Sequence, residues 1–461
     1  MVHTDYFDAI EIAQLRQEFP VGDAFLNRFQ GMGIDELRTH QSRQLAILLE
    51  RAASIPFYQR LWAEAGADHR DVTSIEQLHK LPSFGKSDIM ESIARCPPFG
   101  DHHGRDIPVN GQLLPMILHA TSGTTGTPQP LLFGPRAREV HNLLLARTYL
   151  LQGLLPTDVV HSVYGHGPVN GGHYIREAVT RFTNAMFFSA GTGIETPSVK
   201  QVEFMQAYGA TVIVGFADYI KRLADVANEQ GLEPGKDIPV RMISGQLSQD
   251  ARQSLSEAWG FVEMYDWYGV GDTGVIAAEG PDHNGMHVWE DAHWVELCDI
   301  DSGQVLEADG GYGDMVVTCL FTHDIFPIVR FNTHDVSEFE SGTSDLNLPF
   351  RRIKGFLGRS DNMVKLRGIN IFPQALSSIL ADMQGFTGEY ICIVRSSNGR
   401  DEMTVKIECR VPDKDLSRAY ASRLKQRLGV ELLIELVAPQ SLAAVTGVES
   451  RQKPIRLVDE R

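Results

Sequence analysis

The sequence predicts an α/β protein with a large N-terminal domain of several subdomains and a small α+β C-terminal domain. At 461 residues the chain exceeds the size at which a single hydrophobic core stops growing. Short apolar runs alternate with helical stretches between residues 115 and 335, which is typical of a sheet buried between helices. Roughly the last hundred residues follow a separate pattern of helices and strands.

The large domain is expected to begin with helices and continue with buried strands. Residues 35–95 have the composition of helices joined by loops, and YIKRLADVANEQ at 219–230 is a later helical stretch. Five apolar runs have the length of strands. They are MILHA at 116–120, TVIVGF at 211–216, PVRMISG at 239–245, FVEMYDWYG at 261–269 and MVVTCLF at 315–321.

The small domain is predicted as an α-β-β-α-β unit. Its first helix, PQALSSILADMQG, has Pro373 at a first helical position, apolar residues on one face and Gly385 as a stop. Alternating apolar residues around the turn SSNGRD indicate a pair of strands. The elements in order are 373–385, 390–395, 402–410, 415–429 and 432–439. We therefore predict domains at 1–358 and 359–461, with the boundary near GFLGRSDN.

Composition excludes several classes of partner. The formal net charge is −17, whereas a nucleic-acid or anionic-membrane surface needs clustered Lys and Arg. The acidic amino terminus does not suit a signal peptide, and the apolar runs are too short to span a membrane. The five cysteines are scattered without a C-x-x-C pair, as reduced thiols in a cytoplasm would be. The histidines lack the spacing of a zinc site, so no zinc is expected.

A phosphate-binding loop is indicated by TSGTTGTP at 121–128. Backbone N–H groups and hydroxyls can surround phosphate oxygens there, and the glycines let the backbone approach closely. The loop has no lysine, so it is not the cradle of a P-loop NTPase. FGKS at 84–87 is half of that cradle motif, and with Lys80 in place of its first glycine we interpret it as a coincidence. The alternative for TSGTTGTP is a polar surface turn.

Two further motifs follow the loop, YDWYGVGDTG at 265–274 and GRSDNMVKLRGINIFP at 358–373, before the basic tail SRQKPIR at 450–456. In this order they resemble the phenylacetate–CoA ligase branch of the adenylate-forming enzymes, which includes acyl-CoA synthetases and peptide-synthetase adenylation domains. LHKLPSFGKSDI and PPFG upstream, and GMHVWED and FPIVRFNTHD downstream, extend the resemblance over nearly the whole chain.

The resemblance implies a two-step reaction. A carboxylate attacks the α-phosphate of Mg-ATP to give an acyl-adenylate and pyrophosphate, and the thiol of coenzyme A then displaces AMP. The implied ligands are ATP, Mg²⁺, coenzyme A and a small-molecule carboxylate. The resemblance also implies a homodimer, and a small domain that swings about a hinge between the two steps.

The ATP contacts are carried over residue by residue. The family places a tyrosine against adenine, matched by Tyr268, and an acid on the ribose hydroxyls, matched by Asp335, while Arg359 reaches ribose or phosphate oxygens. Thr127 stands where relatives often carry lysine, so pyrophosphate contacts are expected to be weaker. The remaining predicted nucleotide contacts are Thr121, Ser122, Gly123, Thr124, Thr125, Gly126 and Gly269.

Three further residues match catalytic or hinge positions. Asp272 stands where relatives have a glutamate near magnesium, and it keeps the oxygen ligand with one methylene less reach. Lys453 matches the mobile lysine that bridges the substrate carboxylate and the ATP oxygens during adenylation, although SRQK replaces the usual glycine-lysine pair. Asp361 matches the pivot of the small domain.

The implied acyl pocket departs from that of relatives that activate phenylacetate. In YGHGPVNGG at 164–172, His166 and Val169 replace a tyrosine and a phenylalanine. The smaller valine opens volume and the histidine supplies a donor or acceptor, so an aryl acid or a larger, more polar acid than phenylacetate is expected. The predicted pocket residues are Tyr164, His166, Val169, Phe216, Ala217 and Gln246.

Three functions stay open from sequence. The leading one is an acid–CoA ligase. The second passes the adenylated acyl group to an amine, a hydroxyl or a carrier protein. The third is a non-catalytic nucleotide-binding relative, suggested by Thr127, Asp272 and the altered surroundings of Lys453, but opposed by the retention of Asp335 and Arg359 together with that lysine.

Overall fold

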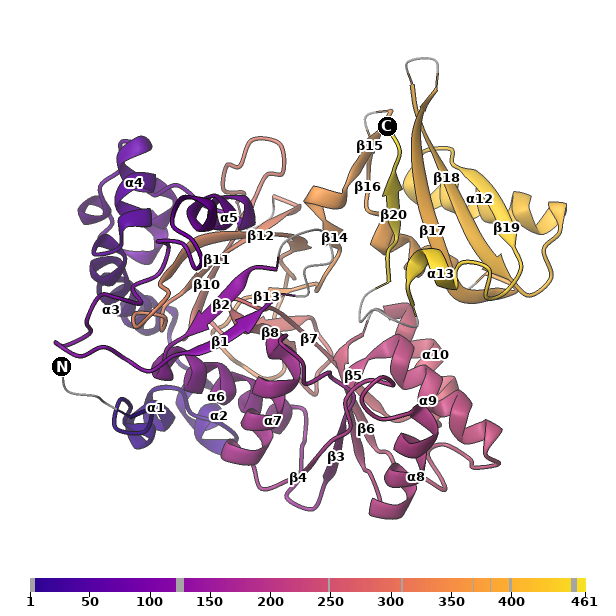
Figure 1. Ribbon diagram of the computed structural model, residues 1–461, viewed down its shortest axis with the longest axis horizontal. Helices are drawn as coiled ribbons and strands as arrows, with labels where there is room; N and C mark the ends of the chain where they lie inside the picture. The colour runs from indigo at the N-terminus through magenta and orange to yellow at the C-terminus, as the bar shows by residue number, and fades with distance from the viewer. Residues whose placement is uncertain are drawn as a thin grey trace.

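The predicted α/β fold is confirmed by a computed structural model of the chain. Figure 1 shows a large body of helices and sheets with a smaller α+β unit at its upper right. Among the described residues, no helix has both the length and the apolar content to cross a bilayer. The structure describes residues 5–121, 128–247, 249–307, 310–367, 369–381, 383–397, 400–448 and 454–461.

The chain begins with the expected helical region. The first described helices pack their apolar faces into the main core, with residues such as Leu37, Leu48 and Tyr58 fully buried. The elements are α1 (Ile12–Glu18), α2 (Asp23–Phe29), α3 (Ile34–Ala53), α4 (Pro56–Glu64), the 3₁₀ turns η1 (His69–Asp71) and η2 (Ile75–Lys80), and α5 (Lys86–Arg95).

An eight-stranded sheet forms the centre of the large body, in the order β13-β9-β8-β7-β6-β5-β3-β4. Strands β3 to β7 pair in parallel, and β8, β9 and β13 extend the sheet in antiparallel fashion. The strands are β3 (Val159–Ser162), β4 (Met186–Ser189), β5 (Val212–Phe216), β6 (Met242–Gln246), β7 (Glu263–Val270), β8 (Gly274–Glu279), β9 (Met286–Val288) and β13 (Arg352–Ile353).

Helices cover both faces of the parallel strands. Val212 and Val214 of β5 face one core with helices α6 and α7, while Ile213 faces another core with α8, α9 and α10. This division follows from the two-residue period of a strand, and it explains why β5 reads as a continuous apolar run. The helices are α6 (Pro135–Leu151), α7 (Asn170–Phe182), α8 (Ser198–Tyr208), α9 (Ala217–Glu229) and α10 (Gln249–Trp259).

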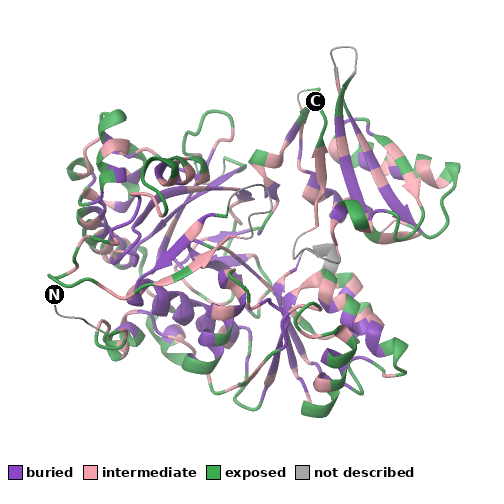
Figure 2. Ribbon diagram, viewed as in Figure 1, coloured by how far each residue is buried: buried purple, intermediate pink, exposed green. Residues whose placement is uncertain are grey.

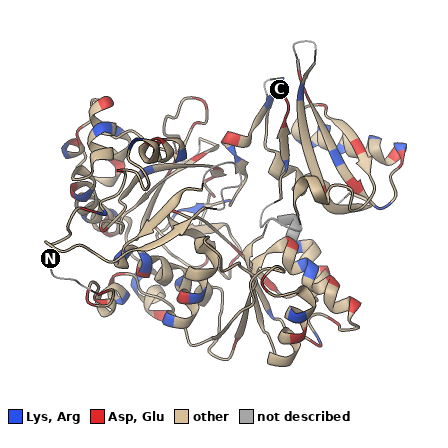
Figure 3. Cartoon of the chain, in the orientation of Figure 1, with Lys and Arg blue, Asp and Glu red and all other residues tan. Residues whose placement is uncertain are grey.

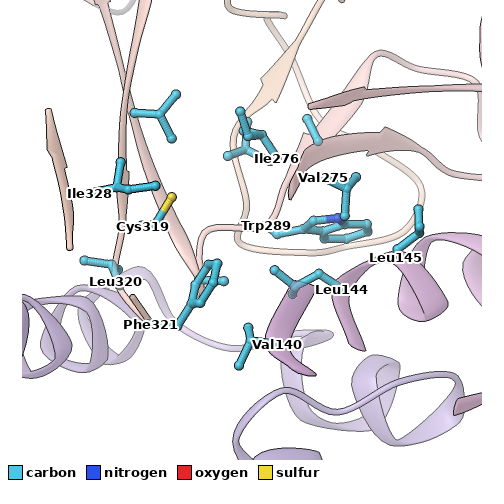
Figure 4. Packing of buried hydrophobic residues seen from close by; sticks show 14 of the residues in the cluster. Val140, Leu144, Leu145, Val275, Ile276, Trp289, Cys319, Leu320, Phe321 and Ile328 are labelled. Carbon is cyan, nitrogen blue, oxygen red and sulfur yellow. The ribbon is translucent and has the colours of Figure 1, made fainter. Parts of the chain in front are cut away.

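A second, antiparallel sheet completes the large body, in the order β10-β11-β12-β14. Its strands are β10 (His293–Cys298), β11 (Tyr312–Cys319), β12 (Ile328–Glu338) and β14 (Gly358–Arg359), and a separate pair is formed by β1 (Ile117–Ala120) and β2 (Pro130–Phe133). Figure 2 shows that burial is concentrated where these sheets meet α6. In that core, Trp289 and Phe321 lie beside Val140 and Leu144 of α6 (Figure 4).

The small unit has its own core, which begins at Val364 and includes Tyr390, Val405 and Leu424. A four-stranded sheet, ordered β19-β18-β17-β20, confirms the strand pair and adds a parallel strand at the carboxyl end that the sequence did not predict. The elements are β15 (Val364–Leu366), β16 (Ile369–Ile371), η4 (Pro373–Ala375), α11 (Leu376–Leu380), β17 (Phe386–Ser397), β18 (Arg400–Cys409), α12 (Lys414–Leu428), β19 (Leu433–Val437), α13 (Ala443–Thr446) and β20 (Leu457–Asp459).

The first helix of this unit is shorter than predicted. Its first turn is a 3₁₀ turn, and the α-helix that follows has five residues, Leu376–Leu380. The buried Tyr390 hydroxyl donates to the Pro373 carbonyl at 2.9 Å, so a tertiary contact takes a carbonyl that a longer α-helix would use. The apolar face is as predicted, since Leu376 and Leu380 are fully buried.

Candidate active site

The predicted site residues gather at the carboxyl ends of the parallel strands. Phe216 ends β5, Gln246 ends β6, and their register partners them directly. Tyr164 follows β3 by two residues, and Tyr268 lies near the end of β7. Ligands of open α/β sheets bind at this edge, because loops and helix starts converge there. The structure thus places the predicted acyl pocket and the predicted adenine contact on one edge of the sheet.

A continuous chain of hydrogen bonds joins four predicted residues. The Tyr268 hydroxyl donates to Asp335 Oδ2 at 2.8 Å, and Arg359 Nη1 donates to Asp335 Oδ1 at 2.8 Å. Arg359 also donates from Nε and Nη2 to the two oxygens of Asp361, at 2.8 and 2.5 Å. Burial, followed by the negative charge of Asp335, raises the pKa of Tyr268, so its hydroxyl stays a donor.

Backbone pairing sets this geometry. Asp335 of β12 and Arg359 of β14 are direct register partners in the second sheet. Gly358, the other β14 residue, has a φ of 152°, and a Cβ there would stand 2.6 Å from Cβ of Phe372. Only glycine therefore lets β14 lie this close to the start of the small unit. The chain passes from Arg359 directly into the 3₁₀ turn η3 (Ser360–Asn362), which carries Asp361.

Asp272 lies at the base of the phosphate-binding loop. Gln129 Nε2 donates to Asp272 Oδ1 at 2.8 Å, and the Gln129 backbone exchanges hydrogen bonds with Thr121, at 3.0 Å to Oγ1 and 2.9 Å from its N–H. Asp272 is only 8% exposed, and burial raises its pKa to about 6. A buried carboxylate with a raised pKa is one that a cation would stabilise, so the site fits Mg²⁺.

Lys86 is a candidate that the sequence analysis dismissed. It is the first residue of α5, and its positive charge lowers the pKa of Asp272, partly opposing the effect of burial. Hydrogen bonds of 3.1 and 2.7 Å hold the Phe84 backbone between Arg330 and Asn332 of β12. Because that strand also carries Asp335, FGKS is brought to the site by tertiary pairing. Its sequence motif alone could not have indicated this.

An aromatic wall lies in the predicted acyl pocket. The ring of Tyr164 stands 4.9 Å from that of Phe216 and 6.4 Å from that of Trp267, measured between centroids. Trp267 was missed because a tryptophan in a strand more often belongs to the core. The signal available in the sequence was its position next to Tyr268, since neighbouring residues of a strand point to opposite faces of the sheet. Val169 precedes α7 as its N-cap, Ala217 begins α9, and the His166 N–H donates to Glu195 Oε1 at 3.0 Å.

Several predictions fall where the structure describes nothing. Ser122, Gly123, Thr124, Thr125, Gly126 and Thr127 lie outside the described residues, and so does Lys453. Gly269 follows Tyr268 in β7 as expected. No group of three potential metal ligands of the His, Cys, Asp and Glu types occurs within the described ranges. Figure 3 shows acidic and basic residues interspersed along the chain.

Comparison with known proteins identifies relatives along most of the chain. Residues 368–461 match the family described as AMP-binding enzyme C-terminal domain. A phenylacetate-coenzyme A ligase of Pseudomonas putida is 28% identical over 92% of this chain and 95% of its own length. The ligase of the same name from Aromatoleum evansii is 26% identical over 93% and 95%.

A solved structure is similar over the same extent. The 2-hydroxyisobutyryl-CoA ligase in the postadenylation state, in complex with 2-HIB-AMP, overlays with a TM-score of 0.81 at 25% identity, covering 94% of this chain and 91% of that one. The same ligase in the thioesterification state, with coenzyme A, gives a TM-score of 0.67 over the same shares. The arrangement of this chain is thus more similar to the postadenylation state.

Asp272→Asn is expected to stabilise the ligand-free protein at about pH 7.5 and to have little effect near pH 4. The folded pKa of about 6 exceeds the ordinary value of 3.8, so the folded state binds the proton more tightly and loses stability as pH rises between those values. Above about pH 6, Asp272 is ionised in the folded state and the full destabilisation by its buried charge is present. Asparagine carries no charge and removes that destabilisation. Thermal melts of both proteins at the two pH values measure the difference.

The half-exposed Asp225, which pairs with Lys221 at 3.2 Å, provides the control substitution Asp225→Asn. An Asp272→Asn effect of equal size at both pH values would show that the buried charge is not its cause.

Proposed function

Since the chain belongs to the phenylacetate–CoA ligase-like branch of the adenylate-forming enzymes, we propose that it activates a carboxylic acid with ATP and transfers the acyl group to coenzyme A. The observation that carries the proposal is the hydrogen-bonded chain from Tyr268 through Asp335 to Arg359. It joins a planar aromatic ring, an acceptor-only carboxylate and a forked cation, which suit adenine, the ribose diol and a nucleotide oxygen respectively.

The first step forms the acyl-adenylate. A carboxylate oxygen of the acid attacks the α-phosphorus of ATP, the bond to the β-phosphate oxygen breaks, and pyrophosphate leaves. Asp272 would hold Mg²⁺, which when bound neutralises charge on the phosphate oxygens. We assign the remaining positive charge to Lys453, Arg359 and Lys86. The loop 121–128 would cradle the leaving pyrophosphate through hydroxyls and backbone N–H groups.

The second step forms the thioester. The sulfur of coenzyme A attacks the acyl carbon, the bond to the phosphate oxygen breaks, AMP leaves, and the thiol proton is released. Transfer to coenzyme A is supported by relatives that are CoA ligases and by a similar ligase solved with coenzyme A. An amine, hydroxyl or carrier-protein acceptor is the alternative, and no contact among the described residues favours it.

The acid is proposed to be aryl, or larger and more polar than phenylacetate. Tyr164, Phe216 and Trp267 supply the flat apolar wall for such a group, and Val169 and His166 supply volume and polarity beside it. The requirement for Mg²⁺, the homodimer and the cytoplasmic location stay predictions.

The proposal is tested by pyrophosphate release from Mg-ATP across a panel of aryl, arylacetic and larger polar acids, each with and without coenzyme A. Release that depends on one acid, and turns over only with coenzyme A, is expected. Pyrophosphate release that depends on an acid but does not change when coenzyme A is added would indicate a different acceptor. If the protein binds ATP but releases no pyrophosphate with any acid of the panel, the enzyme assignment is contradicted.

Lys453→Ala is expected to lower the rate of adenylate formation by about a hundredfold or more, while transfer from a preformed acyl-adenylate to coenzyme A is largely spared. The reason is that the lysine is needed only where charge develops at the α-phosphate. Single-turnover assays of the two half-reactions measure the split.

The control is Lys425→Ala on helix α12 of the same small unit, where the lysine is 60% exposed and pairs with Glu431 at 3.8 Å. Equal losses in both half-reactions for Lys453→Ala would refute the assigned role.

Asp361→Pro is expected to slow the overall reaction more than either isolated half-reaction, because proline restricts the backbone at the proposed pivot. Asp361→Ala removes the same carboxylate, and its contact with Arg359, without fixing φ. The overall rates of the two variants, compared with that of the wild type, separate the effect of losing the carboxylate from the effect of restricting the backbone. If alanine and proline cost the same, the carboxylate matters and the hinge assignment is wrong.

A further inference from the structure

A carboxylate connects two loops at the sheet edge that carries the candidate site. Glu195 lies between β4 and α8, and His166 lies between β3 and α7. The His166 N–H donates to Oε1 of Glu195 at 3.0 Å. The other oxygen, Oε2, accepts from the Thr192 N–H at 2.8 Å and from the Thr192 hydroxyl. One side chain therefore holds the loop of the proposed acyl pocket against the loop that follows the neighbouring strand.

The hydrogen bonds of Glu195 require the charged form of its side chain. Three donors point to its two oxygens, and an ionised carboxylate accepts at both of them. Partial burial disfavours the charge, but the hydrogen bonds from Thr192 and from the His166 backbone outweigh this effect and lower the pKa of Glu195. A neutral amide at this position accepts at one oxygen only, so it cannot satisfy both Thr192 and His166.

The loop that carries Glu195 is fixed to the large body by a buried amide. Gln201 of α8 is fully buried and donates to the carbonyls of Gly191 at 3.0 Å and Thr196 at 2.9 Å. Its Oε1 accepts from His161 of β3 at 3.0 Å. At Gly191, φ is 74° and a Cβ would stand 3.0 Å from Cβ of Glu195, so only glycine fits this turn. Glu195 therefore acts from a fixed support.

Backbone contacts hold three successive residues of the acyl-pocket loop 164–169. The Gly167 carbonyl accepts from His173 of α7 at 2.8 Å, and the carbonyl of the next residue accepts from an N–H of β1 at 2.9 Å. Glu195 adds the contact one residue earlier, from the side of β4. Together these contacts determine how far the aromatic wall at one end of the loop stands from the start of α7 at the other end.

We propose that Glu195 is a positioning residue of the acyl pocket. By holding the His166 backbone, it sets the separation between the ring of Tyr164 and the side chain of Val169, and thereby limits the size of the acid. This rests on the proposed function and adds a residue that determines specificity without touching the substrate. The alternative is a surface contact that contributes only to stability.

Glu195→Gln is expected to weaken binding of the acid and to relax the selection of acids by size. In the pyrophosphate-release assay, the KM for the best acid should rise about tenfold, while the KM for ATP stays within about twofold of wild type. The ratio of kcat/KM between that acid and its homologue with one more methylene should fall roughly fivefold. A contact that served stability alone would leave this ratio unchanged.

Glu195→Asp provides a second variant in case the glutamine variant does not fold. It keeps the charge, but its side chain is one methylene shorter and cannot hold both Thr192 and His166, so the same loss of size selection is expected. Glu203→Gln is the matched control, because it removes a carboxylate of α8 that pairs with Lys200 at 2.6 Å and is 47% exposed. This control should keep the wild-type KM and ratio. Thermal melts of all variants record the effect on stability.

The outcomes separate this inference from the proposed function. If either folded variant of Glu195 keeps the wild-type ratio, whether or not its melting temperature falls, the contact is structural and the inference is wrong, while the ligase function stands. The same holds if the KM for ATP rises as much as the KM for the acid. If the wild-type protein releases no pyrophosphate with any acid, the proposed function fails, and this inference with it.

Discussion

The buried charges of helix α6 are the constraint on which the rest of the structure depends. Arg138 and Arg147 are both fully buried in this helix. Arg147 pairs with Asp291 at 2.7 Å, and Arg138 pairs with Glu177 at 2.7 Å and donates to Asn170 at 2.5 Å. A buried guanidinium without its partners would cost several kcal/mol, so each pair specifies the depth and rotation of the elements around it.

Each contact of α6 places a different part of the candidate site. The Arg147 pair holds the turn between β9 and β10, and the Arg138 network holds the start of α7 through Asn170 and Glu177. His141 packs under the turn that carries Asp272, where a Cβ on Gly274 would meet its ring at 2.8 Å. One buried helix therefore sets the relative positions of the acyl-pocket loop and the proposed metal ligand.

The proposed nucleotide contacts depend on the place where the large body is connected to the small unit. Arg359 contacts Asp335 of the large body and Asp361 of the turn that leads into the small unit. If the small unit swings as proposed and Asp361 moves, these contacts must be kept, loosened or exchanged, so the proposed nucleotide contact of Arg359 would change with the domain arrangement. The overlay is better on the postadenylation state of the similar ligase than on its thioesterification state, with TM-scores of 0.81 and 0.67.

Much of the candidate site was predictable because its chemistry is local. Tyr268, Asp335 and Arg359 were chosen from motifs, and the structure joins them although 67 residues separate the first two. Lys86 and Trp267 were not among the predicted site residues, because their positions at the candidate site depend on contacts with distant strands. The 3₁₀ first turn before α11 has the same cause, since the Tyr390 hydroxyl takes the Pro373 carbonyl there.

The sequence by itself determined the alternation of strands and helices, and the motifs and their order that carry the family resemblance, because these depend on periodicity and local residue type. Only the tertiary structure decided which side chains meet. The register of β12 with β14 places Arg359 on Asp335, and the approach of β1 to α7 places His119 beside His173. Those contacts depend on strand register and on the packing of buried charges, and the two-residue and 3.6-residue periods of the sequence specify neither.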